Sequence, residues 1–305
     1  MPTRKEVAKI KADFVLTREQ LIRDKMSAKQ LELFDIIVKQ YLDKIAGKDL
    51  TSAQQLSAIN AIEKTVRNFS VETNVFLLKE YTQAALSLTD LNMSYFATMF
   101  EDPKKLDEIK QKTNKILSKR LGLDEEGQIK PKGFLDKIIS DNSIQKQVAK
   151  EARKAVSNNY DLKKLQESFK KIIVGGQPGD SGIFERHYNT FAKDILNAID
   201  NSNSKIFADD LGLKYAFYSG GLKTTSRPLC IHYNGKILST TQIEDLKKDP
   251  RITEMYKENI DEYAPFELPG GYGCRHRLDY ISDTLAKGSI RKNNKKAAER
   301  NEKFF

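Results

Sequence analysis

The sequence is poor in cysteine and histidine, with two cysteines and three histidines among 305 residues. Two cysteines cannot form the disulfide framework on which small secreted domains depend. The chain also lacks any run of about 18 apolar residues, so the sequence predicts no membrane-spanning helix. The N-terminal stretch MPTRKEVAKIKADF has no apolar region typical of a signal peptide. We therefore expect a protein made in a reducing cytoplasm, with its cysteines present as thiols or metal ligands.

Acidic residues are outnumbered, with 42 Asp and Glu against 52 Lys and Arg, giving a formal net charge of +10. This balance favours a polyanionic neighbour such as DNA, RNA or an acidic protein surface. Much of the excess lies between Lys287 and Lys303, within a predicted basic C-terminal tail, residues 287–305. No arginine-rich stretch with interleaved aromatic residues is present, so sequence-specific reading of nucleic acid is not predicted. A purely solvated tail remains the alternative interpretation.

The first 174 residues predict an all-helical region. Apolar residues recur at three- and four-residue steps after Thr17, where Thr17 and Gln20 are expected to form a capping box and Gly47 to end the helix. Thr51 and Gln54 are expected to open a second helix in the same way. The further predicted helical segments are 71–100, as one long or two broken helices, 103–121, 132–139, 143–156 and 161–174.

The second half of the chain predicts a mixed α+β module. A glycine-rich stretch, GGQPGDSG at 175–182, interrupts the helical pattern and is the predicted linker. It lacks the spacing of a phosphate-binding loop. The module, residues 183–286, is expected to contain helices at 184–199 and 239–250, a strand at 214–220, a closing strand within 270–282, and a strand–turn–strand at 226–238. The predicted fold class is therefore α+β, with a large helical N-terminal region and a few short strands.

Both cysteines and two histidines occur in two Cys-x-His pairs, Cys230 with His232 and Cys274 with His276. In a strand, residues two apart point to the same face, so each pair would present a thiolate beside an imidazole. Two pairs would supply the four ligands of a closed, tetrahedral Cys2His2 zinc site. Three alternatives stay open: buried thiols beside hydrogen-bonded histidines, a Cys230–Cys274 disulfide outside the cytoplasm, or partly exposed polar positions.

No catalytic set is predicted. A thiol nucleophile would need a third group to orient its histidine, and the sequence offers none at a recognisable spacing. His187, the third histidine, follows Glu185 and Arg186 at the start of a predicted helix and is expected to be exposed or to cap that helix.

The order of elements from His187 to Ile281 resembles the head-morphogenesis domain of phage Mu protein F-like minor head proteins. The motifs that carry the resemblance are LKYAFYSGG, SRPLCIHYNGKILS and GGYGCRHRLDYIS, in the last third of the chain. Two departures are evident. The run 270–273 replaces a histidine that often precedes the closing motif of the family, and His276 replaces its last cysteine.

The resemblance implies a virion component and not an enzyme. Proteins of this family associate with the portal vertex of the phage head, in few copies, and contribute to head assembly and to DNA packaging or delivery. The implied partners are the portal protein, other head proteins and packaged DNA, contacted nonspecifically through basic residues. Two alternatives remain: a virion-delivered toxin or hydrolase, and a zinc-containing protein that binds nucleic acid nonspecifically.

Overall fold

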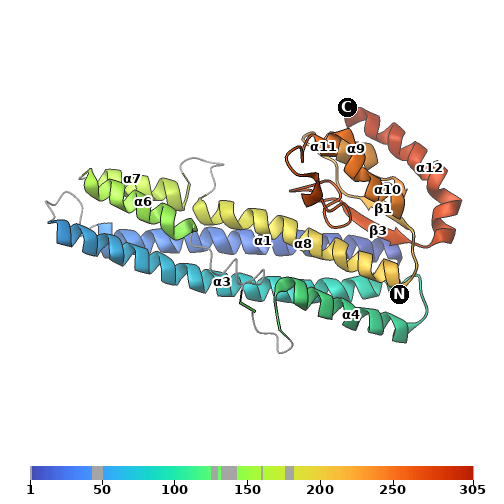
Figure 1. Cartoon of the computed structure of the whole chain (residues 1–305), viewed down its shortest axis with the longest axis horizontal. Coiled ribbons are helices and arrows are strands. Elements are labelled where there is room, and N and C mark those ends of the chain that lie inside the picture. Colours follow the sequence, from blue (N-terminus) through green and yellow to red (C-terminus); the bar gives the residue numbers. More distant parts are fainter. Residues whose placement is uncertain are drawn as a thin grey trace. The chain divides into compact units, whose positions relative to one another are not determined.

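The computed structural model describes residues 2–42, 51–124, 130–131, 143–158, 161–175 and 182–304. These residues are mostly helical, with one three-stranded antiparallel sheet late in the chain (Figure 1). The predicted α+β fold class is therefore confirmed. None of the described helices is long and apolar enough to cross a lipid bilayer.

The chain divides into two compact units. One unit comprises Met1–Arg18, Gln83–Lys119 and Lys193–Phe305, and the other comprises Glu19–Thr82 and Arg120–Ala192. The sheet lies wholly within the first of these, which also takes in segments from the helical half of the sequence. The predicted domain boundaries at 174 and 183 stay a prediction, and most of the predicted linker, 176–181, lies outside the described residues.

The first helix is longer than the sequence indicated. Helix α1 (Arg4–Ile37) continues into a π-helical turn, η1 (Val38–Leu42). The prediction of a start at Thr17 is wrong, because Thr3 and Glu6 form a capping pair: the Glu6 amide donates to Thr3 Oγ1 at 3.4 Å and the Thr3 amide to Glu6 Oε2 at 2.6 Å. The predicted end at Gly47 lies outside the described residues.

Helix α3 (Ser52–Ala97) is a single helix of 46 residues. Its predicted start is confirmed, since the Thr51 amide donates to Gln54 Oε1 at 2.9 Å and the Gln54 amide donates to Thr51 Oγ1 at 3.3 Å. The apolar run predicted separately at 71–100 mostly belongs to this helix. The stretch contains neither glycine nor proline, so nothing in its sequence breaks the hydrogen-bond ladder.

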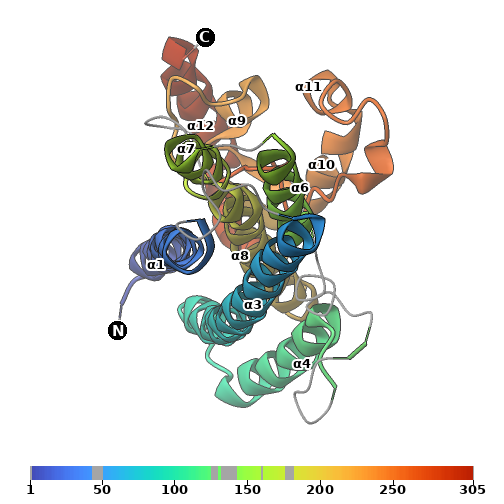
Figure 2. The same cartoon turned by 90° about the vertical axis from the view of Figure 1, so that its left-hand side faces the viewer.

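The remaining helices of the first half lie close to their predicted positions. They are α4 (Pro103–Leu121), α6 (Ser143–Ser157) and α7 (Leu162–Ile173). Within their unit, α6 and α7 pack together as a pair (Figure 1 and Figure 2). The helix predicted at 132–139 lies outside the described residues. Helix α8 (Ile183–Asp210) extends well beyond its predicted end at 199.

The sheet has the strand order β2-β1-β3, with both pairs antiparallel. Strands β1 (Tyr215–Ser219) and β3 (Arg277–Ile281) confirm two predicted strands, and β2 (Ile237–Ser239) completes the sheet. Opposite Ala216, β2 places Leu238 and β3 places Tyr280. These three residues face a large apolar core, so one face of the sheet is buried against the rest of its unit.

The predicted strand–turn–strand at 226–238 is wrong in its first half. Residues Pro228–Tyr233 form a short helix, α9, because Arg227 is extended and Pro228 occupies the first helical position, where its missing amide hydrogen costs nothing. Gly235, with φ of 83°, then turns the chain from α9 into β2, whereas Asn234 has a φ of −57°.

The predicted helix at 239–250 is three shorter elements: α10 (Thr240–Glu244), the 3-10 turn η2 (Asp245–Lys248) and α11 (Pro250–Thr253). The capping box of α10 is formed by Ser239 and Gln242. Asp249 caps α11, so the Asp-Pro pair starts a helix as well as stopping one. A further 3-10 turn, η3 (Ile260–Glu262), leads toward the closing segment.

The predicted basic tail is a helix. Helix α12 (Asp283–Asn301) is followed by the 3-10 turn η4 (Glu302–Phe304). Its inward side combines Ala286, Ile290 and Ala297 with two asparagines. Asn294 exchanges hydrogen bonds with the backbone of Ile237, and the buried Asn301 amide donates to the carbonyl oxygens of Ile231 and Asn234, both at 2.7 Å. The helix is thereby fastened to α9 and β2, and the prediction of a tail is corrected.

Candidate metal centre

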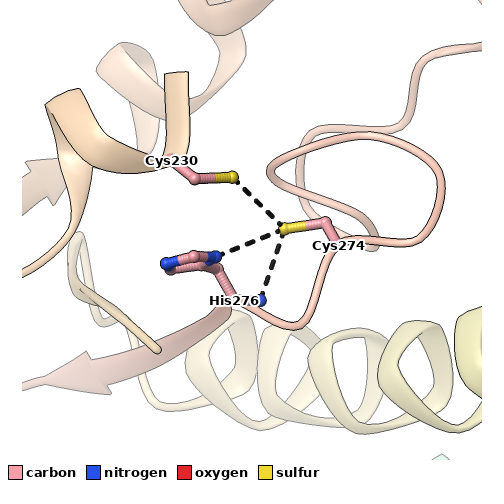
Figure 3. Close-up of side chains that lie close together, drawn as sticks. All are labelled: Cys230, Cys274 and His276. Carbon is pink, nitrogen blue, oxygen red and sulfur yellow. Dashed lines mark hydrogen bonds between the residues drawn. The ribbon is translucent and has the colours of Figure 1, made fainter. Parts of the chain in front are cut away.

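Cys230 is presented by helix α9. Its side chain is 4% exposed and points away from solvent, toward the segment that precedes β3 (Figure 3). The hydroxyl of Tyr218, on β1, donates to Cys230 Sγ at 3.7 Å. A hydrogen bond to sulfur of this kind favours the thiolate over the thiol.

Cys274 and His276 are presented by the loop that leads into β3. Gly271 and Gly273 adopt φ values of 76° and 67°, which glycine allows without strain, and they turn the chain so that both side chains enter the interior. Cys274 is 5% exposed and His276 is 4% exposed. The prediction that this pair presents a thiol beside an imidazole is confirmed, since Cys274 Sγ lies 3.5 Å from His276 Nδ1, although both residues precede β3, which begins at Arg277.

The three side chains meet in one buried cluster. Cys230 Sγ lies 3.7 Å from Cys274 Sγ, and Cys274 Sγ lies 3.5 Å from His276 Nδ1. One ligand atom from each residue lies within 4.8 Å of the others. The prediction that the two Cys-x-His segments converge is therefore confirmed, and these three residues could hold a metal ion.

The spacing of the donor atoms fits tetrahedral coordination. Two thiolates bonded at about 2.3 Å to one tetrahedral ion lie about 3.8 Å apart, and a thiolate and an imidazole nitrogen lie about 3.6 Å apart. The observed separations of 3.7 and 3.5 Å are close to both values. A disulfide would bring the sulfurs to about 2.05 Å, and both cysteines are free thiols here.

His232 does not join the cluster, contrary to the four-ligand prediction. Because α9 is a helix, residues two apart are separated by about 200° around its axis, so His232 points away from the side that carries Cys230. Its Nε2 lies 3.1 Å from Lys236 Nζ, and burial, followed by the nearby Lys236 and Arg251 cations, lowers the pKa of His232. The third histidine, His187, lies in α8, and its predicted exposure concerns a side chain outside the described part.

The two thiols titrate as a coupled pair. The hydrogen bond from the neighbouring thiol lowers the pKa of Cys230 to about 7, against the opposing effect of burial. The same contact, together with burial, raises the pKa of Cys274 well above its usual range. The cluster therefore supplies one thiolate readily near neutral pH, and a metal ion would displace the second proton on binding.

Two glycines leave the room that the cluster needs. A Cβ on Gly270 would lie 2.3 Å from Cys274 Sγ and 2.7 Å from Cys230 Sγ, and a Cβ on Gly220 would lie 2.5 Å from Cδ2 of His276. No larger residue fits at either position without moving a donor atom. Gly270 and Gly220 thus have a steric role at the cluster.

Buried asparagines of α8 hold the ligand-bearing loop in place, and sequence reasoning did not identify them. Asn197 Nδ2 donates to the carbonyl oxygen of Cys274 at 2.6 Å, and Asn201 accepts from the Leu278 amide at 3.0 Å and donates to the Glu267 carbonyl oxygen at 2.9 Å. The signal was the run DNSNS at 200–204, five consecutive polar residues that are all buried inside one helix. Such residues stay buried only when hydrogen-bonded.

The cluster supplies three donors, and a cavity of about 350 Å³ adjoins it. Lys223, Arg227 and Arg275 line this cavity together with the three donor residues, and none of the described carboxylates lines it. The Arg227 guanidinium also donates to the carbonyl oxygens of Gly270 and Tyr272, which ties α9 to the loop. The fourth corner of a tetrahedron at this site would be open to a solvent molecule or small anion.

No family model, curated protein or solved structure matches this chain. What the cluster does must therefore follow from its own residues and from the sequence motifs that contain them.

Proposed function

We propose that this chain is a minor structural protein of a bacteriophage head, associated with the portal vertex, and that a zinc ion on Cys230, Cys274 and His276 closes its C-terminal module. One observation carries the proposal. The two motifs with the strongest family resemblance, 226–239 and 270–282, meet at a single buried cluster although about 30 residues of other structure separate them.

Zinc is the metal that the donor set favours. Thiolate and imidazole ligands suit zinc, a borderline-soft ion whose d electrons impose no coordination geometry. The distances between the donor atoms are those expected around a tetrahedral ion with zinc's bond lengths. The bound ion would cross-link α9 to the loop before β3. Structural zinc contributes roughly 10–16 kcal/mol of binding free energy in small zinc-dependent domains, which is enough to decide whether such a module folds.

The basic surface of α12 supports contact with packaged DNA. Its inward stripe docks on the module, whereas Arg291, Lys292, Lys295 and Lys296 are exposed. Cations on one solvent face bind phosphates without reading bases, and binding weakens steeply with salt. Replacing Lys292, Lys295 and Lys296 with glutamine is expected to reduce the slope of log affinity against log salt by about 2.7 for duplex DNA.

The test of the proposal is the location of this chain in intact particles. Quantitative mass spectrometry of gradient-purified virions is expected to find it at low copy number relative to the major capsid protein. Chemical cross-linking is expected to join it to the portal protein. Absence of the chain from particles whose portal protein is detected would overturn the proposal, whatever the outcome of zinc measurements.

A second candidate, a metal-dependent hydrolase, is favoured by one specific observation. Three protein donors beside a cavity are the arrangement of catalytic zinc sites, whereas structural sites use four protein ligands. Hydrolysis of ester or peptide substrates by the zinc-loaded protein, lost in Cys274→Ser but retained in His232→Gln, would favour this candidate over the structural role.

A further inference from the structure

The face of the sheet opposite the apolar core carries polar and charged side chains that do not belong to the metal centre. Side chains alternate along a strand, so Tyr218 faces Cys230 while Phe217 and Ser219 point to the opposite face. The register places Asp279 beside Phe217 and Arg277 beside Ser219 on that opposite face. It is therefore a mixed surface of apolar and charged groups.

A cavity of about 600 Å³ lies against this face, bounded also by the first turns of α1 and by α12. Its apolar wall includes Phe217, Ile237 and Ile281, of which Ile237 and Ile281 are 1% and 4% exposed. The volume lies within the range of roughly 300–1,000 Å³ that small-molecule sites occupy. The cavity can thus receive the apolar part of a small ligand.

Two buried polar atoms in the cavity lining have no hydrogen-bond partner among the described residues. They are Asp279 Oδ1 and Arg277 Nε. Asp279 is 8% exposed, and its other carboxylate oxygen accepts a hydrogen bond from the Ser219 hydroxyl at 2.5 Å. A buried carboxylate oxygen and a guanidinium nitrogen without partners are costly. They call for a ligand that offers a donor and an acceptor together.

Three cations of α1 line one side of the cavity, near the N-terminus of the helix, where cations are unfavourable. Arg4, Lys5 and Lys9 lie in the first two turns of that helix, where the helix dipole favours negative charge. None of them forms an ion pair with a described carboxylate. Together with Arg277 they outnumber the single carboxylate of the lining, Asp279. The cavity therefore has a positive field that suits an anionic group.

We propose that this cavity binds a nucleoside monophosphate. The phosphate would lie among Arg4, Lys5 and Lys9, and the base would lie on the apolar wall with its polar edge toward Asp279 and Arg277. A nucleobase supplies the required donor and acceptor on one planar apolar ring, whereas a fatty acid would leave both buried atoms unpaired. The proposal depends only on this face of the sheet and not on the metal centre.

Isothermal titration of the full chain at low salt tests the proposal. The probes are the four deoxynucleoside 5′-monophosphates, inorganic phosphate and decanoate, each titrated separately. At least one nucleotide is expected to bind ten-fold or more tightly than inorganic phosphate, and decanoate is expected to bind more weakly than that nucleotide. Equal affinity for phosphate and nucleotides, tighter binding of decanoate, or no binding of any nucleotide would overturn the proposal.

Variants locate the site. Asp279→Asn is expected to weaken nucleotide binding about 10- to 100-fold, the effect of losing a charged hydrogen bond. The double variant Lys5→Gln with Lys9→Gln changes only exposed side chains, so it keeps the test valid if the Asp279 variant does not fold. It is expected to weaken nucleotide binding by at least about five-fold at low salt. The exposed Lys247→Gln serves as the control, and equal losses in the control and the double variant would refute the location.

Discussion

Replacing each of the two histidines next to the cysteines with glutamine distinguishes the three-residue site in the structure from the four-ligand site that the sequence pattern predicts. His276→Gln removes the imidazole 3.5 Å from Cys274 Sγ, whereas His232→Gln removes one on the far side of α9. Both replacements keep a polar side chain of moderate size. The structure predicts that only the first abolishes the stabilisation that zinc provides.

The expected magnitude follows from linkage. An ion held at 100 times its dissociation constant stabilises the folded state by about 2.7 kcal/mol. For a unit of roughly 150–250 residues, each kcal/mol shifts the melting temperature by about 2–4 °C, so zinc is expected to raise it by about 5–11 °C. His232→Gln should retain this increase, and His276→Gln should lose nearly all of it.

Differential scanning calorimetry, with each protein measured in buffered zinc and again with chelator, gives the zinc-dependent difference directly. Comparing each variant with itself removes any change in packing caused by the substitution. Loss of the zinc-dependent increase in His232→Gln with its retention in His276→Gln would contradict the three-residue site. Equal melting temperatures of the wild-type protein with and without zinc would contradict it as well.

Three further predictions concern the same unit. In metal-free protein, the ultraviolet absorbance of thiolates should rise in two steps as the pH increases, the first near pH 7 and the second well above the usual pKa of a cysteine. Cys230→Ser should abolish the first step. Because the pKa of Cys230 is lowered in the folded protein, the contribution of this thiolate to stability is lost as the pH falls through about 7. Gly270→Ala should weaken zinc binding at least about 10-fold by displacing a sulfur, as measured by competition with a chromophoric chelator. The control Gly221→Ala, whose added Cβ would meet no atom within 4 Å, should bind zinc like the wild type, and equal affinities of the two variants would contradict the steric role of Gly270. Lys11→Met should cost about 3–5 kcal/mol in guanidinium unfolding, since it leaves the buried Asp200 carboxylate without its partner at 3.0 Å, and a loss below about 1 kcal/mol would show that the pair is not buried as described.

The pairing of Cys274 with His276 could be predicted from the sequence because it depends only on local backbone geometry. The two residues are only two positions apart just before β3, and the glycines ahead of them mark the turn that directs both side chains inward. The helical half could be predicted for a similar reason, since its apolar spacing is regular and uninterrupted over long stretches.

The position of His232 could not be predicted, because LCIHY is rich in residues that also favour strands. A short helix of six residues has too few turns to show a periodicity, and its start depends on the extended conformation of Arg227 before Pro228. The same two-residue spacing therefore brings its residues together before β3 and separates them in α9.

The docking of α12 could not be predicted because its inward side is only partly apolar, with asparagines among Ala286, Ile290 and Ala297. Asn294 and Asn301 occupy positions where a hydrophobic residue would have revealed the buried face, and they satisfy backbone groups of α9 and β2 instead. The buried polar run of α8 escaped prediction for the same reason. Such residues look solvent-exposed until their partners, distant in sequence, are known.

X-ray absorption at the zinc edge of the purified protein identifies the ligands of the bound ion. We expect one zinc per chain with two sulfur ligands at about 2.3 Å and two lighter ligands at about 2.0–2.1 Å, only one of which shows the scattering pattern of an imidazole. A spectrum with two imidazole ligands would indicate that His232 also coordinates the ion. Absence of zinc from protein purified without chelator would contradict the metal centre altogether.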